Sequence, residues 1–249
     1  MNGDNHPAVA FNNVSCAFGG RDVLKNISFE VAPAEVLCLL GRSGTGKSVT
    51  LRLTIGLLKP DSGAIYVENE NIVEMDEDGL SKIRRCMGFL FQSAALFDSL
   101  SLYENLALPL KRLREKKPDD EIRAIVQNNL DDVGLGKDGG KMPSELSGGM
   151  RKRAGLARAL MLEPHILLVD EPSSGLDRVT ESEIDDLLLR VRERDKTTML
   201  IVTHDIREAR RVGDRVAVLD KGSLIAVGSV DELAKHENAL VRALVSEAA

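Results

Sequence analysis

The sequence contains few aromatic residues and few cysteines, and both shortages exclude classes of protein. Phe, Trp and Tyr make up 3% of its 249 residues and tryptophan is absent, which argues against a surface that stacks unpaired bases. Cys16, Cys38 and Cys86 are widely separated and form no CxxC pair, so neither a zinc ribbon nor a disulfide framework is supported. Cys38 lies in the apolar run 36–40 and is predicted to be a small core residue.

Excess positive charge and long apolar runs are also lacking. The 33 Lys and Arg against 39 Asp and Glu give a formal net charge of −6, whereas a protein whose main task is to grip nucleic acid is usually basic. We therefore expect no nucleic-acid partner. No apolar stretch approaches the roughly 18 residues that span a bilayer, and the polar residues 1–7 lack the apolar core of a signal peptide. We expect a soluble protein, or one that reaches a membrane only through a partner.

Short apolar runs alternate with longer amphipathic stretches along most of the chain, and this alternation predicts an α/β fold. Several runs are apolar throughout, as in a parallel sheet that is covered on both faces. The predicted strands of this sheet are 36–40, 88–91, 166–169, 199–202 and 216–219. The predicted helices are 46–58, 118–133, 148–162, 178–194 and 205–212.

The first part of the chain has a different pattern. Residues 9–17 and 26–31 read as antiparallel strands around a turn at 19–22, and residues 65–68 are expected to join them. We therefore expect an N-terminal antiparallel β subdomain beside the parallel sheet.

The middle and the end of the chain are predicted to be helical. Residues 97–146 are helix-rich with a loop at 134–143, which indicates an inserted helical subdomain. A capping box that begins at Ser229 predicts a terminal helix reaching about Val245. The whole chain is expected to be one domain, with a core and β subdomain at about 1–96 and 163–228, a helical subdomain at about 97–162 and a terminal helix at 229–249.

A phosphate-binding motif follows the first apolar strand and opens a helix. Glycines let backbone N–H groups curl around phosphate oxygens, and the helix N-terminus adds partial positive charge. Lys47 would face the β- and γ-phosphates, and Ser48 would offer a hydroxyl to Mg²⁺. The alternative is a Gly/Ser-rich turn that happens to fit. The motif residues are Gly41, Arg42, Ser43, Gly44, Thr45, Gly46, Lys47 and Ser48.

Two carboxylates, Asp170 and Glu171, end the apolar strand 166–169. The carboxyl end of such a strand is where open α/β sheets bind ligands. Asp170 would help to hold Mg²⁺, and Glu171 would face the attacking water as general base. An exposed strand end with two solvated acids is the alternative.

A second phosphate cradle is predicted at Ser147, Gly148 and Gly149, where serine can cap the following helix and two glycines expose its N–H groups. One γ-phosphate does not need two cradles from one chain. We therefore expect this one to serve a nucleotide bound by another subunit, although a plain turn and helix cap would have the same sequence.

Six ordered motifs make the chain resemble the ATPase subunits of ABC transporters over nearly its whole length. Besides the three motifs above, they are Gln92 in Phe-Gln-Ser, Asp177 in Ser-Gly-Leu-Asp, and His204 in Thr-His-Asp. The resemblance implies a P-loop NTPase core and a head-to-tail homodimer that closes on two ATP molecules with Mg²⁺. It also implies integral-membrane permease subunits as partners and a place on the cytoplasmic face of the inner membrane.

The resemblance also implies roles for single residues. Gln92 would sense Mg²⁺ and the transporter, Asp177 would couple the two sites, and His204 would contact the γ-phosphate. Phe18 occupies the position that stacks on adenine in this family. Each has a structural alternative, because Gln92 could be a strand-end polar residue, Phe18 could be core, and His204 stands just before Asp205, a plausible helix cap.

Details of the motifs resemble one subgroup, the ATPases of lipid-trafficking systems that work with MCE-domain proteins. Met150 replaces the usual Gln after the two glycines, Val49 follows the phosphate loop, and residues 91–110 contain Phe-Gln-Ser-Ala-Ala-Leu-Phe. This likeness implies phospholipid transport, an MCE-domain partner and a small regulatory subunit. The alternatives are a different importer or exporter, a soluble ABC ATPase such as an iron–sulfur-assembly factor, and, far behind, a P-loop kinase.

Overall fold

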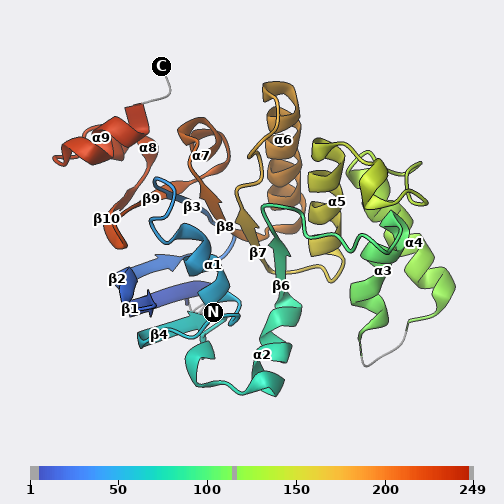
Figure 1. Cartoon of the computed structure of the whole chain (residues 1–249), viewed down its shortest axis with the longest axis horizontal. Coiled ribbons are helices and arrows are strands. Elements are labelled where there is room, and N and C mark those ends of the chain that lie inside the picture. Colours follow the sequence, from blue (N-terminus) through green and yellow to red (C-terminus); the bar gives the residue numbers. More distant parts are fainter. Residues whose placement is uncertain (1–5, 114–116, 247–249) are drawn as a thin grey trace, which may run out of the picture.

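The computed structural model describes residues 6–113 and 117–246, and the chain folds around two sheets (Figure 1). The strands are β1 (Val9–Phe18), β2 (Arg21–Val31), β3 (Val36–Leu40), β4 (Ser62–Val67), β5 (Glu70–Asn71), β6 (Met87–Leu90), β7 (Ile166–Asp170), β8 (Thr198–Thr203), β9 (Arg215–Asp220) and β10 (Ser223–Gly228). The α-helices are α1 (Lys47–Thr54), α2 (Glu77–Ile83), α3 (Leu102–Lys111), α4 (Asp119–Asp132), α5 (Gly148–Leu160), α6 (Arg178–Asp195), α7 (Ile206–Val212), α8 (Val230–Leu233) and α9 (Ala239–Ser246).

The larger sheet has the strand order β10-β9-β3-β8-β7-β6. All its neighbours are parallel except β10, which pairs antiparallel with β9. Every residue of β3, β6, β7 and β8 is buried, as expected of strands that are covered on both faces. The five predicted strands and the α/β fold are confirmed.

The smaller sheet is antiparallel, with the order β2-β1-β4-β5. β1 and β2 form a hairpin whose turn residues, Gly19 and Gly20, have φ angles of 56° and 76°. Such left-handed pairs match the twist of a two-residue hairpin and favour glycine. The predicted strands in the first part of the chain, with 65–68 beside them, are therefore confirmed.

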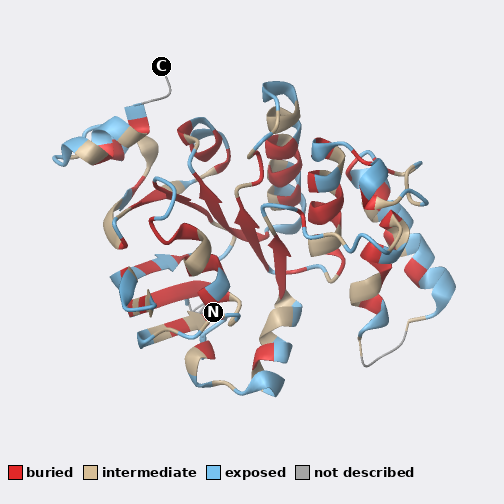
Figure 2. Ribbon diagram, in the orientation of Figure 1, coloured by how far each residue is buried: buried red, intermediate tan, exposed pale blue. Residues whose placement is uncertain are grey.

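Two hydrophobic cores enclose the larger sheet, one on each face, and Figure 2 shows its central strands buried throughout. Alternate residues of one strand serve different cores. Cys38 of β3 packs among the helices α3–α7, whereas Leu37 and Leu39 face α1 and the smaller sheet. This alternation holds the ends of the parallel strands, and thus the loops that follow them, in fixed positions.

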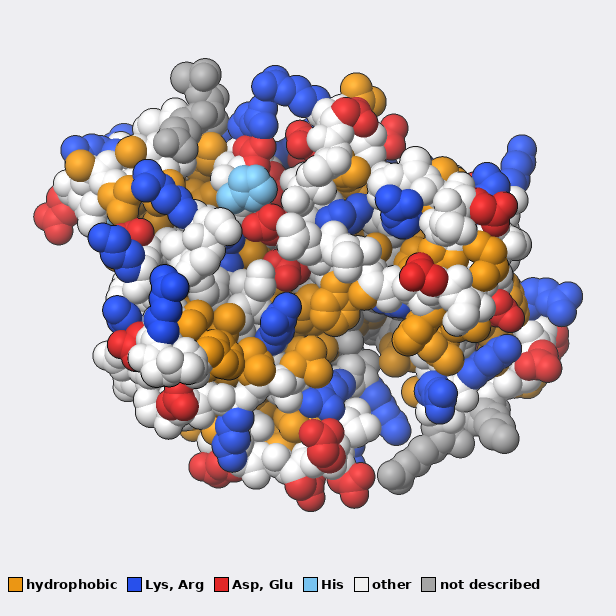
Figure 3. Space-filling view, viewed as in Figure 1, with side chains coloured by type: hydrophobic (Ala, Val, Ile, Leu, Met, Phe, Trp, Pro, Cys, Tyr) orange, Lys and Arg blue, Asp and Glu red, His pale blue; other side chains and the backbone are white. Residues whose placement is uncertain are grey.

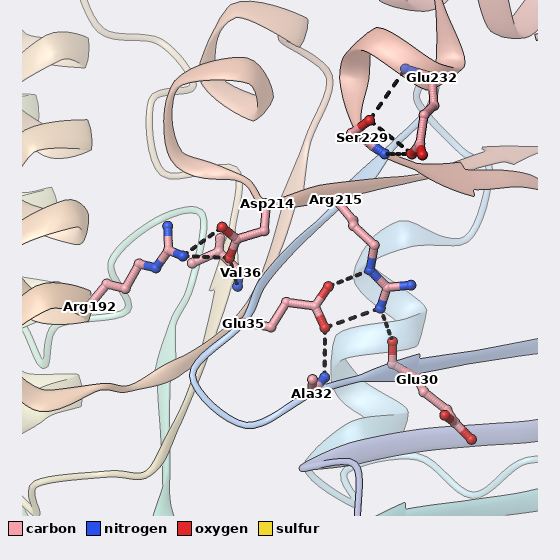
Figure 4. Close-up of polar contacts among 9 residues, drawn as sticks. All are labelled: Glu30, Ala32, Glu35, Val36, Arg192, Asp214, Arg215, Ser229 and Glu232. Atoms are coloured by element: carbon pink, nitrogen blue, oxygen red, sulfur yellow. Dashed lines mark hydrogen bonds and ion pairs between the residues drawn. The ribbon is translucent and has the colours of Figure 1, made fainter. Parts of the chain in front are cut away.

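Two ion pairs with more than one hydrogen bond each connect the layers near the amino ends of the strands (Figure 4). Arg192 of α6 donates twice to Asp214, at 2.6 and 2.7 Å, and Asp214 accepts the N–H of Val36 at 2.9 Å. Arg215 binds Glu35 with both nitrogens of its fork. These pairs lie at the ends of the strands that are opposite to the phosphate loop, and so stabilise the frame without entering the site.

The structure corrects the sequence-based elements in three places. The predicted continuous terminal helix is broken into α8 and α9, because Asn238 caps a new start by accepting the N–H of Leu240 at 2.9 Å; residues 247–249 lie outside the described residues. Helix α1 ends at Thr54, before Gly56 with φ 67°. β10 and α2 are additional elements. β10 follows a tight turn at Lys221 and Gly222, both with positive φ.

Candidate functional site

The phosphate loop lies at the carboxyl end of β3 and leads directly into α1. Gly46 caps the helix with φ 105°, and a Cβ there would lie 2.5 Å from Leu24 Cδ2 and 2.9 Å from the carbonyl oxygen of Val23. Only glycine satisfies both the angle and the space. The loop therefore has the backbone shape that presents N–H groups to phosphate oxygens, and the alternative of an ordinary turn is not favoured.

Lys47 extends from the start of α1 back across its own loop. Its buried ammonium donates to the carbonyl oxygens of Gly41 at 2.7 Å and Arg42 at 3.1 Å, and lies 3.9 Å from Glu171 Oε1. Burial lowers the pKa of Lys47, whereas Glu171 and Asp170 raise it. A positive charge is thus fixed at the centre of the loop.

Ser48 and Asp170 bring two oxygen donors together from α1 and β7. The Ser48 hydroxyl donates to Asp170 Oδ1 at 2.9 Å. Burial raises the pKa of Asp170, while the hydrogen bond from Ser48 and the nearby Arg52 and Lys47 lower it. A hydroxyl beside a carboxylate is a donor set that suits Mg²⁺, so these residues fit the metal that the motifs imply.

Glu171 stands one residue beyond Asp170 in a left-handed conformation, with φ 46°. Its carboxylate is approached from three motifs, by Gln92 Nε2 at 3.3 Å, His204 Nδ1 at 3.4 Å and Lys47 Nζ at 3.9 Å. Its backbone N–H donates to the carbonyl oxygen of Val202 at 2.8 Å. Side chains that are far apart in the sequence therefore converge on one acid.

The side chains of Gln92 and His204 both lie beside Glu171. Gln92 also donates to the Ser174 hydroxyl, at 3.4 Å, so among the described residues its side chain binds Glu171 and Ser174 rather than Ser48 or Asp170. Helix α7 is capped by Asp205, which accepts the N–H of Arg207 at 2.8 Å. His204 is therefore free of capping and faces Glu171.

A cavity of about 860 Å³ opens beside the phosphate loop. Its wall includes the loop residues Gly41, Arg42 and Ser43 together with Glu171 and His204. Arg178, Arg207 and Leu244 complete this wall from α6, α7 and α9. The cavity joins the loop, the acid and the histidine in one space of the size that a nucleotide needs.

The second cradle lies apart from this cavity. Ser147 caps α5 by accepting the N–H of Met150 at 3.2 Å, and both Ser147 and Gly148 are exposed. A Cβ on Gly149 would lie 2.4 Å from Thr180 Cγ2, so a side chain there would push against α6. None of these three residues lines the cavity beside the phosphate loop. Met150 packs partly buried against the helical core.

The remaining predicted residues occupy different settings. Phe18 is 46% exposed at the end of β1, which excludes the core alternative. Asp177 caps α6 and accepts from the backbone of Val179 and Thr180 and from the Thr180 hydroxyl. Val49 packs partly buried against the core below the loop, so its side chain does not face the cavity wall.

Sequence reasoning missed two buried charged residues behind the site, Lys152 and Glu208. Lys152 belongs to an Arg-Lys-Arg run that resembles a solvated helix face, and Glu208 belongs to a charged helix. Helical spacing was the available signal, because Lys152 lies three residues before Gly155 and four before Leu156 on the inward face of α5.

A phosphate loop at the carboxyl end of a parallel sheet, with a Ser48–Asp170 pair beside it, defines the class of P-loop nucleoside triphosphatases. Within this class, the family model described as "ABC transporter" matches residues 24–174. The chain belongs to the ABC transporter family, as an ATP-binding subunit that hydrolyses ATP with Mg²⁺.

Individual relatives agree with this family. The chain is 43% identical, over 94% of its length and 67% of theirs, to the "probable ribonucleotide transport ATP-binding protein mkl" of Mycobacterium leprae. It is 37% identical to the methionine import ATP-binding protein MetN of Caulobacter vibrioides, over 92% of this chain and 69% of that protein. The chain thus spans about two thirds of the length of these relatives.

Solved structures agree as well. The dimeric post-hydrolysis state of the ATP-binding cassette MJ0796, bound to ADP and Pi, matches with a TM-score of 0.83 and 35% identity over 89% of this chain and 98% of that one. CbiO1 from Clostridium perfringens, part of the complex cbiONQ, matches with a TM-score of 0.81 and 29% identity over 96% of this chain and 98% of that one. Among the described residues, no helix is long and apolar enough to cross a membrane.

Proposed function

We propose that this chain powers a lipid transporter of the inner membrane by hydrolysing ATP at two sites that form between head-to-tail subunits. The observation that supports the catalytic part is the convergence on Glu171, whose carboxylate lies within 3.3–3.9 Å of Gln92, His204 and Lys47. Glu171 is assigned as general base, His204 as the contact to the γ-phosphate, and Gln92 as the residue that senses Mg²⁺ and the transporter.

The residues around Glu171 act mainly by position and charge. Lys47 and the N–H groups of residues 41–48 bind the phosphates and offset the negative charge that develops on the transferred group. Ser48 and Asp170 hold Mg²⁺, which neutralises phosphate charge when bound. Glu171 then takes the proton of the attacking water, a contribution of about 10²–10⁴-fold.

The second cradle is assigned to the nucleotide of the partner subunit. Ser147 and Gly148 are exposed, Gly149 is buried beneath them, and all three lie outside the chain's own cavity, which supports a role in trans. Asp177 couples the two sites from the cap of α6, and exposed Phe18 is available to stack on adenine. The functional unit is therefore a homodimer.

Lys47→Ala and Glu171→Gln are expected to fail in different ways. Lys47→Ala removes the cation of the loop, so the affinity for ATP should fall. Glu171→Gln keeps the shape of the site and removes the base, so ATP should bind and persist, and the variant should elute as an ATP-bound dimer. ATP binding and size-exclusion chromatography with Mg²⁺ measure both. A Glu171→Gln variant that hydrolyses ATP at the wild-type rate would show that the base lies elsewhere.

A surface for the permease is proposed beside Gln92. A hollow of about 550 Å³ is lined by Phe91, Phe97, Leu108 and Pro109, and the guanidinium of Arg158 lies 5.9 Å from the Phe97 ring centre. Phe97 is exposed. Figure 3 shows a hollow on this face between the part that holds β6 and the part that holds α3, with hydrophobic side chains on both sides. An apolar segment of a membrane partner would fill it.

The cargo is proposed to be phospholipid, with an MCE-domain protein and a small regulatory subunit in the assembly at the cytoplasmic face. Met150, Val49 and the segment 91–110 support this subgroup. The names of the relatives, which refer to ribonucleotide transport and methionine import, supply the competing cargoes.

Co-purification from membranes separates these cargoes. The chain, expressed together with its permease, should sediment with membranes and retain phospholipid and an MCE-domain protein, whereas the chain alone should not float with liposomes. A complex that instead contains a methionine-binding protein, or that transports ribonucleotides, would refute the lipid assignment and leave the ATPase assignment intact.

A further inference from the structure

Lys152 is a buried lysine in the second turn of α5, the helix that begins at Ser147. Its residue is 6% exposed, and its ammonium donates to the backbone carbonyl oxygen of Glu171 at 2.7 Å. A lysine is almost never buried so far unless it is paired. The catalytic mechanism given above does not use this side chain.

The atom that Lys152 contacts belongs to a constrained backbone. Glu171 has φ 46°, a strained conformation for a non-glycine residue. Three hydrogen bonds hold it there: the Glu171 N–H donates to Val202, and the Glu171 carbonyl oxygen accepts from Lys152 at 2.7 Å and from the N–H of Ser174 at 3.3 Å. Without Lys152, the carbonyl oxygen would keep only the longer bond from Ser174, which belongs to the same loop.

Glu208 is a buried carboxylate that affects the pKa of Lys152. It is 4% exposed on α7, and neither carboxylate oxygen has a hydrogen-bond partner among the residues that the structure describes. Glu208 is the carboxylate that most raises the pKa of Lys152, against the lowering caused by burial. Buried charges of opposite sign partly offset each other's desolvation. Asp170 and Glu171 act on Lys152 in the same direction.

The other contacts of α5 connect the Lys152–Glu171 hydrogen bond to further parts of the molecule. At its start, Ser147 is exposed toward the proposed partner nucleotide. Six residues after Lys152, Arg158 donates to the carbonyl oxygens of Ala94 and Ala95, which lie two and three residues after Gln92. A Cβ on Gly155 would lie 2.9 Å from Ala94 Cβ, so the helix and this segment touch closely. One rigid helix thus reaches the partner-facing surface, the Gln92 segment and the Glu171 backbone.

We propose that Lys152 is a positioning residue that fixes the orientation of Glu171 to the helix of the second cradle through its hydrogen bond to the Glu171 carbonyl oxygen. Movement of α5, when its start meets the partner's ATP, then moves the base of its own subunit into place. This inference rests on the proposed function, because it takes Glu171 as the base.

Lys152→Met keeps the apolar stem and removes the donor. We expect kcat for ATP hydrolysis to fall about 10- to 100-fold, as for small displacements of a catalytic group, and KM for ATP to change by less than about threefold, since Lys47 and its loop are intact. Lys152→Arg should restore most of kcat. Lys82→Met, an exposed lysine on α2, is the matched control.

Hydrogen exchange gives a readout that is independent of turnover. In nucleotide-free protein, the peptide 171–176 should exchange faster in Lys152→Met than in wild type or Lys82→Met. In a Glu171→Gln background, ATP should protect this peptide, and Lys152→Met should remove the protection. The role of Lys152 would be overturned if Lys152→Met left the exchange of this peptide unchanged or kept the wild-type kcat. It would also be overturned if Lys152→Met and Lys152→Arg lost kcat equally. An active Glu171→Gln enzyme would instead overturn the proposed base.

Discussion

Glu208 and Asp185 are carboxylates that the fold shields from water behind the candidate site. Burial raises the pKa of Glu208 to about 7 and that of Asp185 to about 6. Asp185 and Asp205 raise the pKa of Glu208 further. Between about pH 4 and pH 7, the native state therefore binds more protons than the unfolded chain does.

The stability of the protein should depend on pH through Glu208. Because its folded pKa lies above its ordinary value of 4.5, its contribution is fully present below about pH 4.5 and is lost as the pH rises toward about 7. The free energy of unfolding of the wild type should fall between about pH 5 and pH 8. In Glu208→Gln this fall should be smaller by on the order of 1–3 kcal/mol. Urea unfolding at both pH values measures the difference. Equal pH dependence in the two proteins would contradict the assignment.

Contact between α5 and β6 depends on the absence of a side chain at Gly88. A Cβ there would lie 2.5 Å from the carbonyl oxygen of Ala159 and 3.0 Å from Leu167 Cδ1. The first neighbour is helix backbone, which cannot rotate away. The helix of the second cradle therefore packs on the sheet at a distance that only glycine permits.

Gly88→Ala should lower the unfolding free energy by about 1–3 kcal/mol, the usual cost of overpacking. The matched control is Gly140→Ala, because a Cβ at Gly140 would have no neighbour within 4 Å and its φ is not left-handed. Denaturant unfolding of both variants measures the effect. A Gly88→Ala protein as stable as Gly140→Ala would show that the helix can shift at little cost.

Elements that carry their own pattern could be predicted from the sequence, and those fixed by distant contacts could not. The strands of the larger sheet were visible as apolar runs, because both of their faces are covered. β10 was missed because it is a half-exposed edge strand without alternation, with the burial pattern of a loop. The terminal helix was predicted as continuous because nothing local except Asn238 signals the new start.

The residues of the candidate site also fall into those with a local sequence signal and those positioned by distant contacts. The phosphate loop and Asp170–Glu171 could be identified because glycine spacing and strand-end acids are local signals. The approach of Gln92 and His204 to Glu171 was implied only by resemblance, because their contacts join residues 79 and 33 positions apart. Lys152 could not be found, because its burial depends on how α5 packs against the loop after β7.

At the scale of the whole chain, the two surfaces proposed to face nucleotide lie apart. Residues 41–43 of the phosphate loop, Glu171 and His204 line one cavity, whereas Ser147 and Gly148 are exposed at the start of α5 and do not line it. In the proposed homodimer, each surface takes its complement from a second copy. The proposed permease hollow beside Phe97 shares no lining residue with the cavity.

Mixing two inactive variants tests this arrangement most directly. Glu171→Gln lacks the base and keeps a normal second cradle, while Ser147→Arg blocks the cradle and keeps a normal base and phosphate loop. In a head-to-tail dimer of one subunit of each kind, one site contains only intact parts. The mixture should therefore hydrolyse ATP well above the sum of the separate preparations, and a mixture no more active than that sum would contradict sites shared between subunits.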